Sequence, residues 1–390
     1  MKTCLILILT TFVTNYVFAN TDWSNEATLP GNEKCFLSHG HEVCLKDGNR
    51  KNIFGLSEHE FQKSIINGSK HALNYPVDVT ELKIPKNAMD KFFEVDSSSP
   101  LRRFIFKFAK KLSPFKSFEQ LFTWVGLHDY PQSTNEQGPN IIANMGQLED
   151  YPMGVSIFHD GKNQSMTFSC AACHSNDLFG TKVLGMTNRF PRGNELFLMG
   201  KKALKVSNTL MFKMFVGPST KDAKHFKAAK KAMKYVDSKD PLVLGLDTSL
   251  AQVGLSLALR NKDDYATRPR FVSKKSHPLK KKPADSKPAV WWNLKYKTKW
   301  LSDAAIESGN PIFTNFLWNE IGRGIDLKSL EKWLDSNKQK VNELTSYVFN
   351  AEPPKYNDYF PSQINIAKAK RGEKLFLKGC KGCHGVYEKG

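Results

Sequence analysis

Two five-residue segments of the form Cys-x-x-Cys-His constrain this chain more than any other feature of its sequence. In such a segment the two thiols can add to the vinyl groups of a haem, and the adjoining imidazole can bind the iron. With 7 Cys and 10 His among 390 residues, random placement would produce roughly 0.003 such segments per chain. The sequence therefore predicts two covalently bound c-type haems, attached through Cys170 and Cys173 with ligand His174, and through Cys380 and Cys383 with ligand His384.

The first residues have the pattern of a secretory signal peptide. Lys2 supplies a positive charge, residues 5–9 open an apolar stretch, and residues 17–19 end in Ala19 before a cleavage point. An uncleaved anchor is the alternative, but polar residues interrupt a segment already shorter than the ~20 apolar residues of a membrane span. We expect residues 1–19 to be removed and the mature chain to lie in the periplasm without spanning the membrane.

Paired cysteines can also form a redox disulfide or a zinc site. Export and the His that directly follows both motifs argue against these two alternatives. A thioredoxin-like Cys-x-x-Cys would be expected near a βαβ pattern, which neither segment shows. A zinc site could pool the four cysteines into one cage, but the two adjoining His residues favour haem. Removal of Cys4 leaves Cys35 and Cys44 outside the motifs. We predict that these two form a disulfide in an oxidising compartment, the alternative being two free thiols.

The formal charge of +19 is concentrated rather than even. Its densest run lies among prolines and comprises Lys274, Lys275, Lys280, Lys281 and Lys282. We predict a solvated surface loop there. Alternatively, a basic face steers an acidic redox partner or holds the protein near an anionic membrane. Nucleic acid is not expected as a partner of an exported protein.

The apolar pattern along the chain favours helices. Helical spacing predicts helices over residues 201–215 and 221–236, and Asp326 is the expected N-cap of a helix whose apolar stripe continues to Val348 before Pro353-Pro354. Basic and apolar residues alternate over residues 101–108, a pattern that favours helix packing over a membrane surface. No long alternating strand competes with these helices. We therefore expect a mainly α fold.

The flanks of the second motif resemble the N-terminal helix of a cytochrome c domain. The resemblance rests on Ala367, residues 370–372 with Gly372, the apolar pair Leu375-Phe376, and the motif itself. A cytochrome c domain normally continues for several dozen residues and supplies a distal ligand from them, whereas only six residues follow His384. We expect the second haem domain to be incomplete.

From about residue 130 to residue 390 the chain resembles the di-haem cytochrome c peroxidase superfamily, which includes MauG-like enzymes and rubber oxygenases. The long segment before the first motif is closer to the rubber-oxygenase-like branch. The resemblance implies two cytochrome c-like haem domains after an N-terminal extension. The expected divisions are 1–19 signal peptide, 20–130 extension, 131–270 first haem domain, 271–361 inter-haem segment and 362–390 start of the second haem domain.

The resemblance also assigns roles between the motifs. Residues 288–294 and 300–303 are similar to the family's inter-haem stretch, although Ala304 stands where Gly is usual, and they make Trp291 or Trp292 a candidate electron relay. Core packing is the alternative for both rings. Residues 319–322 resemble the segment that places an acidic residue over the open haem face. That role falls to Glu320, the alternative being a solvated helix-cap carboxylate.

No His occurs between His174 and His225, so the first haem lacks the displaceable ligand of compact peroxidases. It is then five-coordinate or uses another residue, with His128 and His159 ahead of Met186 and Met199. The resemblance implies a haem oxidoreductase that reduces peroxide or activates oxygen at haem 1, with electrons passing through haem 2 from a small cytochrome or copper protein. It further allows for calcium. The alternatives are an oxygenase that cleaves an unsaturated hydrocarbon and an electron carrier without a substrate.

Overall fold

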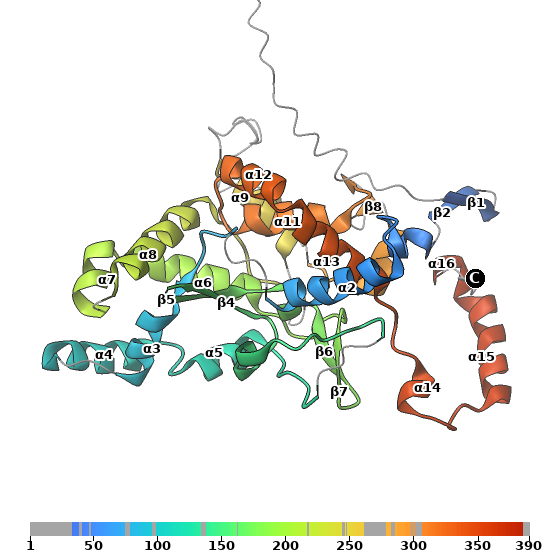
Figure 1. The fold of residues 1–390 in the computed structure, drawn as a ribbon, viewed down its shortest axis with the longest axis horizontal. Helices are drawn as coiled ribbons and strands as arrows, with labels where there is room; N and C mark the ends of the chain where they lie inside the picture. The colour runs from blue at the N-terminus through green and yellow to red at the C-terminus, as the bar shows by residue number, and fades with distance from the viewer. Residues whose placement is uncertain are drawn as a thin grey trace, which may run out of the picture.

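The structure is a computed structural model that describes residues 33–38, 41–46, 48–74, 79–95, 99–133, 138–161, 163–216, 218–243, 246, 248–260, 278–281, 285–297, 299–300 and 306–384. The predicted signal peptide, Cys4, most of the Lys/Pro stretch, Asp303 and Ala304 lie outside these residues. Helices dominate the described part, which confirms a mainly α fold (Figure 1).

The first third of the chain contains a hairpin and several helices. Its elements are β1 (Glu33–Ser38), β2 (His41–Lys46), the 3-10 helix η1 (Gly48–Asn52), α2 (Glu58–Leu73), β3 (Ile84–Pro85), α3 (Lys86–Glu94), α4 (Pro100–Leu112) and α5 (Phe118–Val125).

The middle of the chain holds two further hairpins followed by helices. Its elements are η2 (Gly146–Asp150), β4 (Val155–Asp160), β5 (Asn163–Phe168), η3 (Cys170–Ala172), β6 (Ser175–Leu178), β7 (Thr181–Leu184), α6 (Gly193–Val206), α7 (Thr209–Val216), α8 (Thr220–Ala232), η4 (Met233–Tyr235) and α9 (Ser249–Ala258). β3, β5 and β4 form one small antiparallel sheet in that order.

The last third is helical apart from one short strand pair. Its elements are α10 (Pro278–Lys281), η6 (Trp291–Tyr296), β8 (Lys299–Trp300), β9 (Ile306–Glu307), α11 (Pro311–Gly322), α12 (Leu327–Ser336), α13 (Lys338–Asn350), α14 (Tyr356–Tyr359), α15 (Ile366–Gly379) and α16 (Lys381–His384).

The main core forms where α13 packs along α2, two helices far apart in sequence that lie side by side in Figure 1. The approach is close because Gly68 has no side chain, and a Cβ there would overlap Glu343 and Tyr347. The Tyr347 hydroxyl donates a hydrogen bond to the Ile141 carbonyl at 2.6 Å, and the Ser69 hydroxyl donates to the same oxygen at 2.8 Å. These bonds tie the loop before the first motif to both helices.

The predicted helices form with interruptions. Residues 201–215 are divided between α6 and α7, because Ser207 takes an extended backbone and ends α6. Asp326 is the N-cap of α12, as predicted, and its side chain accepts a hydrogen bond from the Ser329 amide. The apolar stripe continues on α13 after a break at Asn337, and the chain leaves the helix at Ala351, ahead of the two prolines.

Short strands that the sequence analysis did not identify form between residues 155 and 184. β4 and β5 pair from Val155 opposite Phe168 to Asp160 opposite Asn163, and β6 pairs with β7. Their buried positions, among them Ile157 and Met166, contact α5 and its neighbours. Runs of four to six residues carry too little periodicity to reveal such strands, so tertiary packing decides them.

The described part of the Lys/Pro stretch forms a short helix, α10, in place of the predicted loop. Lys280 lies on α10, and its ammonium pairs with Asp237 at 2.8 Å and donates to the Ser238 carbonyl at 3.1 Å. At this residue the expectation of a solvated chain is wrong, because the lysine joins α10 to the segment after α8.

The backbone of the first hairpin is compatible with the predicted disulfide. Antiparallel pairing of β1 with β2 places Cys35 directly opposite Cys44. Cα atoms of directly opposed residues are about 4.5–5.5 Å apart, within the range of about 4.4–6.8 Å that a disulfide spans. The Cys35–Cys44 bond stays a prediction.

In the part of the chain that is described, no helix is both long enough and apolar enough to cross a bilayer.

Replacing Gly154 with alanine is expected to destabilise the fold strongly. Gly154 has φ +103°, and a Cβ there would lie 2.6 Å from Cα of Ala172 inside the first motif. Gly180 has φ +86° with nothing within 4 Å of its Cβ position, so it is the matched control. Urea unfolding should show that G180A costs about 1–2 kcal/mol for the backbone strain alone. G154A should cost at least about 2 kcal/mol more, and equal losses would contradict this packing of the motif.

Candidate functional site

The first Cys-x-x-Cys-His motif forms a tight turn between β5 and β6. The amides of Cys173 and His174 both donate to the Cys170 carbonyl, at 3.2 and 3.0 Å. This 3-10 turn, η3, follows a strand, whereas the second motif follows the helix α15. The turn places Cys170, Cys173 and His174 on one short, hydrogen-bonded stretch of backbone.

Asn188 holds this turn in place. Its amide nitrogen donates to the Cys173 carbonyl at 2.9 Å, and its Nδ2 donates to the carbonyls of Ala172 at 2.8 Å and Gly126 at 2.7 Å. The side chain is 1% exposed, so these bonds are shielded from water. Sequence reasoning missed Asn188, because no motif or spacing distinguishes it from other asparagines.

The cysteines of the first motif are not joined to other cysteines. Cys170 and Cys173 are both partly buried and neither forms a disulfide. Burial raises the pKa of the Cys170 thiol to about 11, an effect that the nearby Arg323 partly opposes. Cys170 is therefore a protonated thiol at neutral pH, and it packs against the main core.

The His174 imidazole is neutral at pH 7. Burial lowers its pKa to about 4, and the nearby Ala289 backbone only partly offsets the shift. Its Nδ1 atom is shielded from solvent and has no hydrogen-bond partner of good geometry among the described residues. A neutral imidazole is the form that binds a metal. Two cysteines outside any disulfide and a neutral imidazole in one turn fit covalent haem attachment, with Cys170 and Cys173 as thioether residues and His174 as ligand.

Trp291 lies against this imidazole. The two ring centroids are 5.4 Å apart, and the ring of Tyr347 lies beyond, 5.5 Å from Trp291 at an interplanar angle of 81°. Gly185 connects the backbones of His174 and Trp291. Its amide donates to the His174 carbonyl at 2.7 Å, and its carbonyl accepts from the Trp291 amide at 2.9 Å. Trp291 is 3% exposed, whereas Trp292 is only partly buried. The structure thus distinguishes the two tryptophans.

Glu320 is buried rather than solvated. It lies near the end of α11 with 0% exposure, so a solvated helix-cap carboxylate is the wrong interpretation. Its Oε1 accepts a hydrogen bond from Arg323 at 3.1 Å, and the same guanidinium donates to the Phe168 carbonyl at 2.8 Å. Phe168 precedes Cys170 by two residues. Arg323 therefore connects Glu320 with the first motif; sequence reasoning missed it, although its i, i+3 spacing from Glu320 on a helix was a signal.

The candidate distal ligands differ in their positions. His128 pairs with Met153 through the backbone and shares Asn188 with the motif, and burial is the first cause of its lowered pKa. His159 is exposed on β4 opposite Gln164, four residues beyond the strand end that adjoins the motif. At about 3.3 Å per residue, His159 lies roughly 13 Å along the strand. Met186 and Met199 are partly buried. Met186 lies between Gly185 and Asn188, whose backbone amides both bond to the motif, and His128 adjoins the motif through Asn188.

The second motif is set apart from the first. Cys380 is exposed at the end of α15, and residues 361–382 are all exposed (Figure 1). The side chains of Cys383 and His384 lie outside the description. Among the described residues, no three His, Cys, Asp or Glu side chains gather as a metal site would require. The described thiols thus give no support to a zinc cage that pools both motifs, and calcium stays a prediction.

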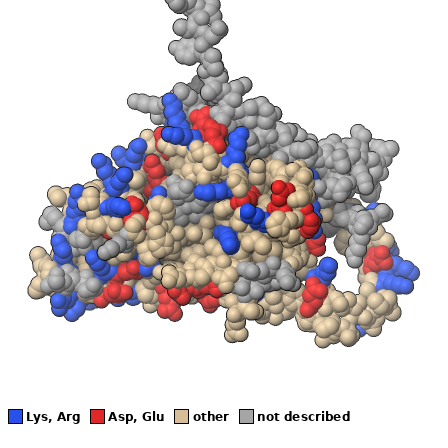
Figure 2. All heavy atoms as spheres, in the orientation of Figure 1, with Lys and Arg blue, Asp and Glu red and all other residues tan. Residues whose placement is uncertain are grey.

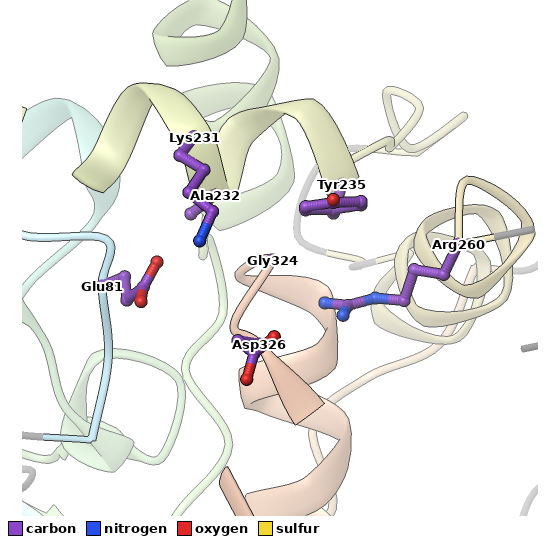
Figure 3. A pocket seen from close by; sticks show the side chains of 7 residues that line it. All are labelled: Glu81, Lys231, Ala232, Tyr235, Arg260, Gly324 and Asp326. Atoms are coloured by element: carbon purple, nitrogen blue, oxygen red, sulfur yellow. The ribbon is translucent and has the colours of Figure 1, made fainter. Parts of the chain in front are cut away.

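A small polar cavity lies just beyond Arg323. Its volume is about 100 Å³, and its lining includes Lys231, Tyr235, Arg260, Gly324 and Asp326 (Figure 3). Burial acts to raise the pKa of Asp326, but hydrogen bonds from Ser329 and the charges of Lys231 and Arg260 outweigh it and lower the pKa. At about 30 Å³ of liquid per water molecule, the cavity suits a few waters and is too small for a haem.

No protein-family model, curated protein or solved structure matches the chain.

Replacing Arg323 with leucine is expected to cost about 3–5 kcal/mol of unfolding free energy, because the buried Glu320 carboxylate loses its guanidinium partner. Denaturant unfolding provides the measurement. The exposed Arg189 is the control, and R189L should change stability by less than about 0.5 kcal/mol.

The double variant E320L/R323L should recover part of that loss, since replacement of a whole buried ion pair by apolar side chains is often tolerated. If R323L were as mild as R189L, the ion pair would not be the link between α11 and the first motif.

Proposed function

We propose that this chain is an exported di-haem c-type cytochrome that acts as an oxidoreductase, reducing peroxide or activating oxygen at the first haem. Haem 1 is attached through Cys170 and Cys173 with ligand His174. Haem 2 is attached through Cys380 and Cys383 with ligand His384, and passes on electrons from a small cytochrome or copper protein.

The observation that carries the proposal is the state of the first motif. Neither of its cysteines is in a disulfide, its imidazole is neutral, and backbone hydrogen bonds hold all three residues in one turn. Thioether attachment needs free thiols, and iron ligation needs an imidazole nitrogen without a proton. When bound, a haem supplies a Lewis acid and a store of electrons.

Trp291 is the residue we assign to electron passage. It is in ring contact with both His174 and Tyr347, so it connects the ligand with the core where α13 meets α2. Because these rings are in contact, an electron that passes from His174 to Tyr347 through Trp291 crosses two short distances in place of one long one. Trp292 is adjacent in sequence but only partly buried, which makes it the matched comparison.

Glu320 is the residue we assign to proton handling. Cleavage of a peroxide bond requires a proton to move from one oxygen to the other, and a positioned carboxylate can carry it. Arg323 favours the ionised form of this carboxylate, which can accept a proton, and its second bond to the Phe168 carbonyl positions the pair beside the motif.

Haem attachment provides the direct test. In a host with haem-attachment machinery, the denatured mature chain should carry two haems by mass, and C170A/C173A and C380A/C383A should each carry one. The oxidised wild-type protein should have a high-spin band that shifts with cyanide, and C170A/C173A should lack that band.

A bare polypeptide mass for the wild-type chain would refute the whole proposal. Two low-spin haems that do not respond to cyanide would leave an electron carrier and refute the enzyme. Product analysis with hydrogen peroxide and with polyisoprene then separates peroxidase from oxygenase.

The W291F variant should slow peroxide-dependent oxidation of a reduced donor protein, whereas W292F should leave it unchanged. Stopped-flow absorbance measures both rates. W291F also removes packing against Gly185, at a cost of about 1–3 kcal/mol, so the rates are compared where unfolding curves show both variants folded. Equal rates for the two variants would exclude Trp291 as the relay.

A further inference from the structure

Helix α4 packs on the body of the protein through the face that carries Phe106. Phe106, 2% exposed, points inward, with its ring 5.9 Å from that of Phe92 on α3. Ser99 caps the start of the helix by accepting from the Arg102 amide, and Lys110 donates to the Phe93 carbonyl. The helix therefore has a fixed orientation, which determines the residues on its outer face.

The outer face carries large apolar side chains in solvent. Leu101 is 67% exposed, Phe104 69% and Phe108 60%. Spacings of three and four residues place them in one row along the helix. Single exposed apolar residues are ordinary, but a row of three on one helix marks an interaction surface.

Positive charge adjoins this row. Arg103, Lys107 and Lys111 are exposed and follow one another along the neighbouring strip of the helix, since each residue advances about 100° around the axis. The helix sequence Pro-Leu-Arg-Arg-Phe-Ile-Phe-Lys-Phe-Ala-Lys-Lys-Leu contains no acidic residue. The outer face is thus half apolar and half cationic.

The same end of the molecule continues this pattern on α6 and α7. α7 contacts both α3 and α4, and it carries exposed Leu210 and Lys213 with no acidic residue. Val206, 80% exposed, ends α6. Figure 1 shows α4 and α7 at one extremity, and Figure 2 shows Lys and Arg side chains along that end.

We propose that this end of the protein, with α4 as its main contact, binds the surface of an anionic phospholipid membrane. An amphipathic helix lies in the interface with its apolar side chains among the acyl chains and its cations at the headgroups. The three apolar side chains project from a helix of fixed orientation, so they can enter the acyl region of a bilayer together. The sequence predicted that this segment packs as a helix, and Phe106 does so. We assign Leu101, Phe104 and Phe108 to membrane contact.

Vesicle sedimentation of the full haem-loaded chain tests the proposal. The protein should pellet with phosphatidylglycerol-containing vesicles, bind pure phosphatidylcholine weakly, and bind less as salt is added. F104S/F108S should weaken binding at least tenfold, by roughly the transfer energy of two aromatic side chains. K107Q/K111Q should weaken it roughly fivefold per lysine.

The control pair is K328Q/K332Q, which removes two exposed lysines with the same spacing from α12, a helix on another side of the molecule. It should leave binding nearly unchanged, and L242S controls for loss of an exposed apolar residue. Circular dichroism melting should show all variants folded. Lack of wild-type binding at low salt, equal effects of the two lysine pairs, or full binding by F104S/F108S would overturn the proposal. Binding to an acidic protein without any binding to vesicles would also overturn the proposal.

Discussion

The packing of Tyr347 between α2, the loop at Ile141 and Trp291 is the contact on which the rest of the structure depends. The residue is fully buried, its Cβ and the Glu343 backbone approach Gly68 too closely for any side chain there, and its hydroxyl donates to the Ile141 carbonyl. Its ring touches Trp291, whose ring touches His174. The first motif is therefore joined to the main helix pair through the ring contacts of Trp291.

Burial explains the chemistry of that motif. Partly buried surroundings keep the Cys170 thiol protonated and the His174 imidazole neutral, while the backbone bonds of Asn188 and Gly185 hold both in one turn. The proposed haem function uses this arrangement directly, because it requires a neutral imidazole and cysteines outside any disulfide. The Glu320–Arg323 pair brings a buried carboxylate next to the same turn.

The two ends of the molecule contrast with this interior. α15 exposes Leu375 and Phe376 together with the second motif, and α4 exposes a row of apolar residues beside cations. Our proposals assign the second haem to the end with α15 and a membrane contact to the end with α4. α4 is held to the body of the protein through Phe106, whereas α15 has no buried residue.

The sequence by itself determined the chemistry-bearing residues, because Cys-x-x-Cys-His is a local motif, and it determined the helices whose caps and periodicity are local, such as the one begun by Asp326. Only the tertiary structure decided what depends on distant contacts. The short strands around the first motif, the choice of Trp291 over Trp292, and the roles of Asn188 and Arg323 arise from residues far apart in sequence. No local pattern encodes such contacts, since packing between segments creates them.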